Sequence, residues 1–345
     1  MEPELDDEEL QQRELVMAMP ALPLRAHAQV TAPVAGDRLV GVAVGAGNEM
    51  QVLWCAARDR DPLFQLGGGW RSPISHGRPL RAVDVRLSVH VAGVSALVRT
   101  IPSFPFAFPL VRMLPGGRIL AVGNKCVWHP SGPERNAVVY GADGRVEAEA
   151  TWGDDILHLM VGADDTIWAG YGSIAIWGSG NGWGGPGPAP PGCPGLIRYS
   201  ADDLSRTWSY PRESPWGGID DCAALNVADD GTWISYYSGL PLVRITERGI
   251  AGWRTDIVRG VRAVAVGYEH VALLGGYGAG FDVLTVGTLN DGRFDIAGQY
   301  RLVLPDGGPI GQGAVIGRGA LLHTVIGDTW YQFSVDDQFT WSHRE

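Results

Sequence analysis

Short apolar runs separated by tight polar turns fill most of the chain, in the alternation that antiparallel strands require. The run at 37–57 contains a Gly-Asn turn, the run at 108–123 turns at Pro-Gly-Gly, and the run at 137–150 turns at Asp143 and Gly144. Apolar residues almost never recur at the helical spacing of 3.6, so helix should be scarce. The pattern therefore predicts an all-β protein assembled from hairpins.

One stretch of the chain occurs twice. Residues 155–171 and 221–237 align with one residue of slippage, and the match resumes after a gap at 195–200 and 241–246. The shared positions include the acidic pairs Asp154-Asp155 and Asp220-Asp221 and the rings Trp168 and Trp233. Four short apolar runs joined by tight turns are typical of a β-propeller blade.

Units of this kind begin near residues 38, 108, 156, 222, 261 and 313. They predict one β-propeller of six blades, each with four antiparallel strands; the alternatives are five or seven blades, because 58–82 is poorly patterned. Residues 1–20 form a separate acidic, mobile arm with a short helix at 7–18. The predicted domains are therefore the arm, 1–20, and a single propeller, 21–345.

The third unit carries an acidic residue, an apolar strand, a polar turn and an Ile-Trp-x-x-Tyr strand, followed by a Gly/Trp-rich segment. These residues are Asp155, Asp164, Asp165, Ile167, Trp168, Tyr171 and Gly182-Trp183-Gly184. Over about residues 150–250 the chain resembles actinobacterial-type bacterial β-propeller repeat proteins. The resemblance implies the propeller fold and no particular chemistry.

Composition narrows the class of protein. The chain has 49 Gly and 23 Pro, as many turns require, and 13 Trp spread along its length. More than half of the net charge of −11 lies in the first 15 residues, and no basic stripe follows, so nucleic acid is not expected as a partner. No membrane partner is expected either, since no apolar run reaches about 20 residues.

The four cysteines form no CxxC pair, and the acidic start is unlike a secretion signal. The cysteines are therefore interpreted as reduced thiols in a cytoplasmic protein. The protein is expected to be a monomer.

The segment at 172–195 is the clearest departure from the repeat. It has no Lys, Arg, Asp or Glu, and carries Trp177 and Trp183 among glycines and prolines. Long loops of this kind often carry function, so the two rings are candidate binding residues for a sugar, a peptide or a flat ligand. The alternative is a lid that folds onto the blade and buries its own rings.

In a four-stranded meander, the connection before the first strand and the connection between the second and third strands lie at the same end. The acidic pairs Asp154-Asp155 and Asp220-Asp221 precede first strands, so they should lie at the end where 172–195 lies. Crowded carboxylates share a proton or recruit a cation. All four are candidate binding residues, and Asp155 and Asp221 are candidate metal ligands for a divalent cation, although no cofactor is certain. The alternative is that they cap the chain where it turns.

Two further candidates differ between the copies of the repeat. His158 is replaced by Ala224, and Met160 by Asn226. Each lies on a predicted inner strand, where His158 and Asn226 are candidate catalytic residues for acid/base chemistry. The alternative is that both only meet water.

Three hypotheses follow, in this order. The first is a non-enzymatic binding or scaffold module that presents its loop-rich face to a protein or a small ligand. The second is a propeller lyase or hydrolase with a polar, metal-assisted site that uses His158. The third is a structural role in which the arm at 1–15 docks on a basic partner. The sequence does not decide whether the protein is an enzyme.

Overall fold

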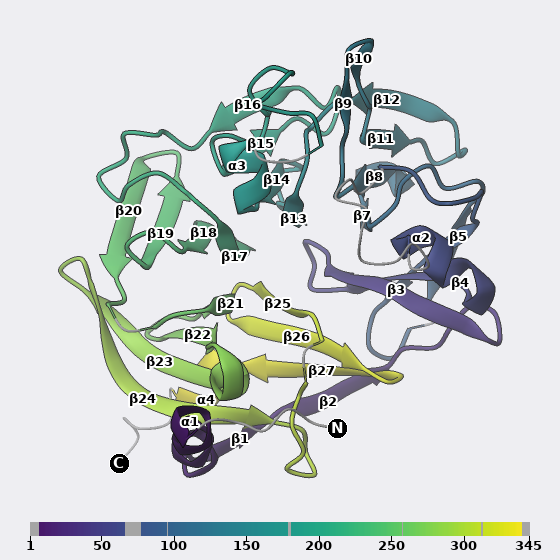
Figure 1. The fold of residues 1–345 in the computed structure, drawn as a ribbon. Coiled ribbons are helices and arrows are strands. Elements are labelled where there is room, and N and C mark those ends of the chain that lie inside the picture. The colour runs from purple at the N-terminus through teal and green to yellow at the C-terminus, as the bar shows by residue number, and fades with distance from the viewer. Residues whose placement is uncertain are drawn as a thin grey trace. The chain divides into compact units, whose positions relative to one another are not determined.

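The structure is a computed structural model, and it describes residues 7–65, 77–94, 96–178, 181–256, 258–311 and 313–339. These residues form a series of small antiparallel sheets with little helix, which confirms an all-β, propeller-like fold (Figure 1). The chain divides into two compact units. We call Val30–Cys222 the central unit, and Met1–Gln29 with Ala223–Glu345 the terminal unit. Among the described helices, none is long and apolar enough to cross a membrane.

The central unit contains three four-stranded antiparallel sheets and a short hairpin. The first sheet has strand order β3-β4-β5-β6, formed by Asp37–Val44, Met50–Ala56, Val85–His90 and Leu97–Ile101. The second has order β12-β11-β8-β7, formed by Val146–Ala150, Ala137–Tyr140, Ile119–Gly123 and Pro109–Met113. The third has order β13-β14-β15-β16, formed by Ile156–Val161, Ile167–Tyr171, Leu196–Tyr199 and Arg206–Ser209. The hairpin pairs β9 (Trp128–His129) with β10 (Gly132–Pro133).

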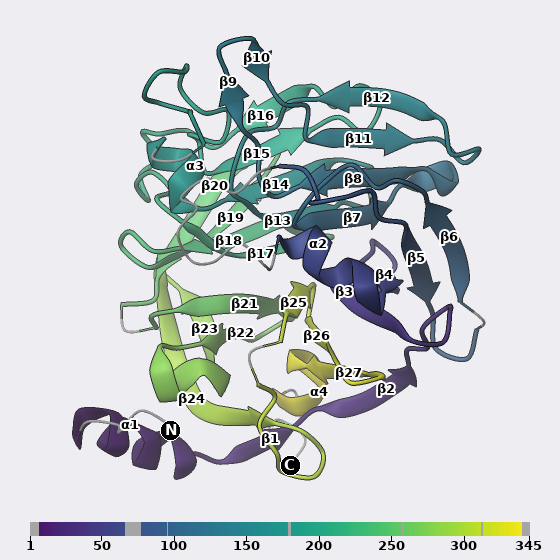
Figure 2. The same ribbon diagram turned by 45° about the vertical axis from the view of Figure 1, so that its right-hand side comes forward.

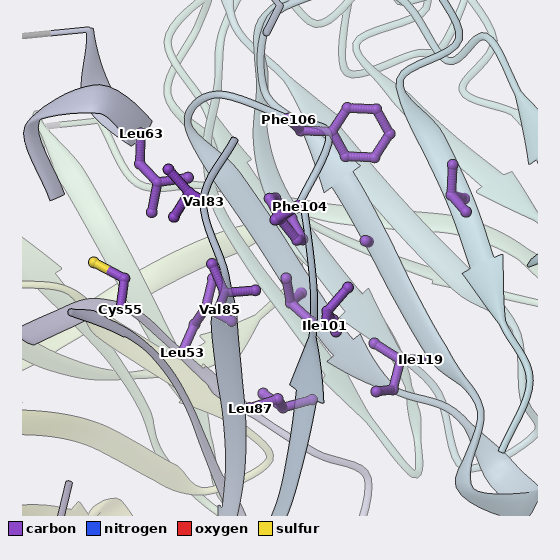
Figure 3. Close-up of a cluster of buried hydrophobic side chains, with 13 residues drawn as sticks. Leu53, Cys55, Leu63, Val83, Val85, Leu87, Ile101, Phe104, Phe106 and Ile119 are labelled. Carbon is purple, nitrogen blue, oxygen red and sulfur yellow. The ribbon is translucent and has the colours of Figure 1, made fainter. Parts of the chain in front are cut away.

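The first and second sheets pack through alternate residues of their strands. Leu53 and Cys55 of β4 share one face, as do Val85 and Leu87 of β5, since side chains alternate along a strand (Figure 3). They belong to a buried cluster that also includes Phe104, Phe106, Ile119 and Val138. Burial of such side chains, at about 1.5–3 kcal/mol each, stabilises this part of the unit.

The terminal unit contains one nine-stranded sheet and one four-stranded sheet. Eight strands of the larger sheet form two antiparallel meanders, joined where Arg254 of β20 pairs in parallel with Arg293 of β24. Their bounds are β17 (Cys222–Ala228), β18 (Gly231–Tyr236), β19 (Pro241–Thr246), β20 (Gly249–Arg254), β21 (Val261–Val266), β22 (Val271–Gly275), β23 (Val283–Asn290) and β24 (Arg293–Val303).

The N-terminal segment completes both sheets of this unit. β1 (Ala21–Pro23) runs parallel to β24, and β2 (Arg25–Gln29) runs antiparallel to β27 (Figure 2). β2 is the fourth strand of the smaller sheet, whose other strands are β25 (Val315–Arg318), β26 (Leu321–Ile326) and β27 (Thr329–Ser334). The predicted last unit, from residue 313, contains only three of these strands, because the fourth, β2, lies some 300 residues away in the chain.

The helices are short. They are α1 (Asp7–Met17), α2 (Arg60–Phe64), α3 (Ser173–Trp177) and α4 (Val335–Phe339), with 3-10 turns η1 (Ala57–Asp59), η2 (Pro115–Gly117) and η3 (Gly278–Asp282). α1 lies within the predicted arm and contacts η3, and Val16 of α1 is buried. The poorly patterned stretch 58–82 begins with η1 and α2, and its residues 66–76 lie outside the described part of the chain.

Candidate functional site

Buried hydrogen bonds and a ring stack hold the connection that leads into β13. Trp152 is fully buried, stacks on Tyr199 with ring centroids 4.0 Å apart, and accepts a hydrogen bond at its carbonyl from the Tyr171 hydroxyl at 2.9 Å. Asn136 accepts from the Trp152 N–H at 2.8 Å and donates to the Gly153 carbonyl at 2.8 Å. The acidic pair that follows is therefore placed by a satisfied, buried network.

Asp154 ties three connections of the central unit together. Its Oδ1 accepts from the Cys126 N–H at 3.1 Å, and its Oδ2 accepts from the Asn181 side-chain amide at 2.8 Å. Burial raises the pKa of this carboxyl, and the Lys125 ammonium and backbone N–H donors oppose that rise. Because both carboxylate oxygens are used inside the protein, Asp154 acts as a brace between 151–155, 124–136 and 172–195.

Asp155 is buried and points its carboxylate at a cation. Its backbone φ is +55°, in the left-handed region that aspartate tolerates better than most residues. Oδ1 lies 3.2 Å from the Lys125 Nζ, and Oδ2 accepts from the Ile174 N–H at 3.1 Å. A Cβ added at Gly172 would lie 2.3 Å from Oδ2, so glycine is needed there for the close approach. The meander topology correctly placed this pair beside the 172–195 segment.

The second acidic pair reaches the same neighbourhood. Burial raises the pKa of Asp221, and the negative charges of Asp155 and Asp220 raise it further. The part of the chain that the structure describes gives the Asp221 side chain no hydrogen bond or ion pair. We call Lys125, Asp155, Asp220 and Asp221 the acidic cluster. The three carboxylates outnumber the one ammonium, which pairs with Asp155, so the cluster carries excess negative charge.

The two tryptophans of the 172–195 segment have different environments. Trp183 is only 5% exposed, and its indole N–H donates to the Cys126 carbonyl at 2.7 Å. Trp177, at the end of α3, is 69% exposed. Gly182 and Gly187 lie against Trp128 so closely that an added Cβ would collide with it. The segment is therefore a packed wall that offers one exposed ring, with residues 179 and 180 outside the described part.

The two catalytic candidates lie in different units. His158 is on β13 of the central unit, whereas Asn226 is on β17 of the terminal unit. Asn226 is fully buried, and its amide donates to the carbonyls of Val264 at 2.8 Å and Gly319 at 2.9 Å while accepting from the Gly319 N–H at 2.8 Å. These three bonds use both amide hydrogens and the amide oxygen, and the side chain is buried, so it is not presented to a substrate.

The described residues contain no group of three or more His, Cys, Asp or Glu side chains arranged to hold a metal ion. At Asp155 the place of a counter-ion is taken by the Lys125 ammonium. Sequence reasoning missed Lys125, although it follows the strand Ile119–Gly123, in the connection between the second and third strands of its sheet. The same topological rule that grouped the acidic pairs also predicts that position.

No protein-family model matches the chain, and no curated protein matches it. Among solved structures, the extracellular domain of a candidate one-component system from Bacteroides thetaiotaomicron is 10% identical with a TM-score of 0.42. It covers 90% of this chain, which spans only 40% of that one. A candidate 6-phosphogluconolactonase from Bacteroides fragilis is 10% identical, with a TM-score of 0.43 and 77% of each chain covered. A candidate gluconolactonase is 12% identical, with a TM-score of 0.36 and coverage of 90% of this chain and 97% of its own. Likeness at this level carries no argument about activity, and none of these names supports the actinobacterial part of the resemblance.

Proposed function

We propose that the protein is a non-enzymatic binding module whose ligand site is the acidic cluster with its wall of connections. The supporting observation is that Asp221 lies close enough to Asp155, from another connection, for their charges to interact. Lys125 pairs with Asp155, whereas Asp221 has no hydrogen bond or ion pair among the described residues. A rigid site with one unsatisfied carboxylate is suited to capture a ligand without rearrangement.

The ligand class follows from charge. An incoming cation relieves the repulsion among Asp155, Asp220 and Asp221 that raises the Asp221 pKa. Lys125 already fills the position nearest Asp155, so we favour an organic ammonium or guanidinium over a bare divalent ion, which needs several oxygen ligands at once. Trp177 ends α3, the helix whose Ile174 N–H binds Asp155, and its exposed ring is the one we propose that such a cation contacts.

Six blades are also part of this proposal. The four separate four-stranded sheets and the two meanders of the nine-stranded sheet supply six units of four strands. The unit starts predicted near 38, 108, 156, 222, 261 and 313 lie within a few residues of β3, β7, β13, β17, β21 and β25.

The test is a thermal-shift titration of the intact protein near neutral pH. The probes are spermidine, choline and arginine methyl ester, with sorbitol as an uncharged control and Mg²⁺, Ca²⁺, Mn²⁺ and Zn²⁺ as separate arms. A ligand that binds only the folded state raises the Tm by mass action. We expect an organic cation to raise the Tm of the wild type, and Asp221→Asn and Trp177→Ala to reduce that rise.

The matched control is Asp202→Asn, which removes an exposed carboxylate from the same unit and should respond as the wild type does. If no organic cation shifts the Tm, or if Asp221→Asn responds like the wild type, the proposed ligand class is wrong. A shift with one divalent ion alone, reversed by a chelator, would replace the organic cation by a metal.

A second function, lyase or hydrolase, is favoured by one observation. The raised pKa of Asp221, caused by burial and by the charges of Asp155 and Asp220, is the kind of perturbation that acid/base catalysis uses. An aldonolactone is a convenient first substrate, because its ring opening releases a proton that an indicator reports. Turnover lost in Asp221→Asn and retained in Asp202→Asn would place this function first; absence of turnover in the wild type would exclude that substrate.

A further inference from the structure

A hollow lies in the terminal unit. It has a volume of about 560 Å³ and is bordered by β18, β19 and β20 on one side and by the β21–β22 turn and the end of β23 on the other. A neighbouring hollow of about 450 Å³ follows the β19–β20 turn. Asp230 and Arg244 line both, so the two adjoin. We call them together the turn groove.

Two stacked indoles form the base of the turn groove. The rings of Trp233 and Trp253 lie 5.5 Å apart at 23°, and the Arg244 guanidinium covers Trp233 at 5.4 Å. Asp230 accepts from the Trp233 indole N–H at 2.9 Å and pairs with Arg244 at 3.3 Å. Trp233 is therefore held by Trp253, Arg244 and Asp230, whereas half-buried Trp253 also lines the groove.

The third sheet shows which part of this arrangement is structural. There Trp168 contacts Trp208 at 5.5 Å, and Arg198 lies 5.8 Å from the Trp168 ring. Since two sheets use the same Trp-Arg-Trp set, the set stabilises a sheet in both. What is particular to the turn groove is the turn that faces the set.

In that turn, 267–270, two side chains take no part in the hydrogen bonds that close the turn. In the turns at 143 and 164, an aspartate accepts from a backbone N–H two residues on. At 267–270 the backbone closes by the Gly267 N–H to the His270 carbonyl at 2.9 Å, and the Tyr268 N–H is held by the Asp336 carboxylate at 2.8 Å. The Tyr268 side chain is 92% exposed, and within the described chain the exposed Glu269 carboxylate makes no bond. Both line the groove.

We propose that the turn groove binds an extended, uncharged oligosaccharide. Tyr268 and Trp253 offer ring faces to the C–H faces of sugar rings. Glu269 and Glu247 accept hydrogen bonds from hydroxyls, and Arg248 donates them. The charged side chains that line the groove carry opposite signs in nearly equal number, which favours a neutral polymer over a nucleic acid or a polyamine.

The groove therefore differs from the acidic cluster in charge and in position. It lies at the hairpin turns, the strand ends opposite to those at which the connections of the acidic cluster lie in each meander. Its ligand can be established or rejected whatever the cluster binds.

The test is calorimetric titration of the intact protein with hexasaccharides of glucose (β-1,4 and α-1,4), xylose, mannose and N-acetylglucosamine. We expect one of these to bind in one-to-one ratio, and Tyr268→Ala and Glu269→Gln each to weaken the binding about tenfold (about 1.4 kcal/mol). Tyr237→Ala is the matched control, because Tyr237 is an exposed tyrosine of the same unit that does not line the groove, and its affinity should equal that of the wild type.

A second measurement keeps the test independent of folding. Binding at the groove should alter tryptophan emission in the wild type, and Trp253→Phe should remove most of that change. If none of the hexasaccharides binds, the proposal is wrong. It is also wrong if one binds but Tyr268→Ala and Glu269→Gln, with unchanged Tm, retain wild-type affinity.

Discussion

Replacement of Asn226 by alanine tests whether this residue serves the fold or a reaction. In the structure its amide joins β17 to β21 and to the turn between β25 and β26: it donates to the carbonyls of Val264 and Gly319 and accepts from the Gly319 N–H. The side chain is fully buried. Asn226→Ala removes all three bonds at once and leaves a space that water must fill or the strands must close.

The magnitude follows from what each backbone group retains. The Gly319 carbonyl keeps a second donor, the Val266 N–H at 2.7 Å, so its loss is an ordinary hydrogen bond of about 0.5–1.5 kcal/mol. The Val264 carbonyl loses a similar amount. The Gly319 N–H loses its acceptor, which costs about 1–3 kcal/mol when the group stays away from water. We therefore expect Asn226→Ala to lower the free energy of unfolding by about 3 kcal/mol.

The assay is urea unfolding followed by far-UV circular dichroism, with amide hydrogen exchange of the peptide containing Gly319 as a local report. The matched control is Asn290→Ala in the same unit, because the Asn290 amide bonds Thr288 and Asp295 at an exposed position. That variant should cost no more than about 0.5 kcal/mol. If Asn226→Ala costs less than about 1 kcal/mol, or no more than Asn290→Ala, the structural role is refuted and Asn226 returns as a candidate for chemistry.

Three further predictions concern the central unit. Burial and the charges of Asp155 and Asp220 raise the folded-state pKa of Asp221, so its ionisation lowers the stability of the protein as pH rises through that pKa. Asp221→Asn should therefore have a higher Tm than the wild type at neutral pH, and the difference should disappear below about pH 4. Equal Tm values across this range would contradict the raised pKa. Gly172→Ala forces a Cβ against Asp155 and should cost about 1–3 kcal/mol in a denaturant melt, whereas Gly185→Ala, which meets open space, should cost far less; similar costs would count against the close approach. Burial raises the pKa of Cys55 to about 11 and raises the pKa values of Cys126 and Cys222 further. A thiol reagent should therefore label Cys193 alone in the native protein and all four cysteines after denaturation. Rapid labelling of Cys222 in the native protein would mean that β17 is less buried than described.

Most of the sheet structure could be predicted from local pattern. Hairpins such as β7–β8, β11–β12 and β23–β24 have alternating apolar residues and turn residues next to each other in the chain, so the sequence specifies them directly. β1 and β2 could not be found in this way. They pair with strands about 280 and 300 residues away, and no local turn signal marks such a pairing.

The candidate site could be predicted only in part. Topology correctly grouped Asp154 and Asp155 with the segment at 172–195, because the ends of a meander's strands follow from strand order alone. The sequence did not indicate which of the two tryptophan rings is buried. Trp183 is buried and binds the Cys126 carbonyl, whereas Trp177, six residues earlier, is exposed. Such differences depend on neighbours, here the hairpin at 128–133, that come from another sheet.

The two acidic pairs show how a repeated sequence feature acquires different roles. Asp154 uses both carboxylate oxygens to brace the connections around it, and Asp155 is matched by Lys125. Asp221 lies at the position equivalent to Asp155 in the next unit, yet within the described structure its carboxylate has no ion-pair partner of the kind that Lys125 provides for Asp155. Where the carboxylates of an acidic pair have partners within the protein, as in the first copy, they stabilise the fold. Where a carboxylate of the pair has none, as in the next copy, a ligand that supplies the partner gains the most by binding. The difference between copies, rather than the shared residues, therefore indicates where function lies, and the same comparison separates Tyr268 and Glu269 of the turn groove from the aspartates that close the other turns.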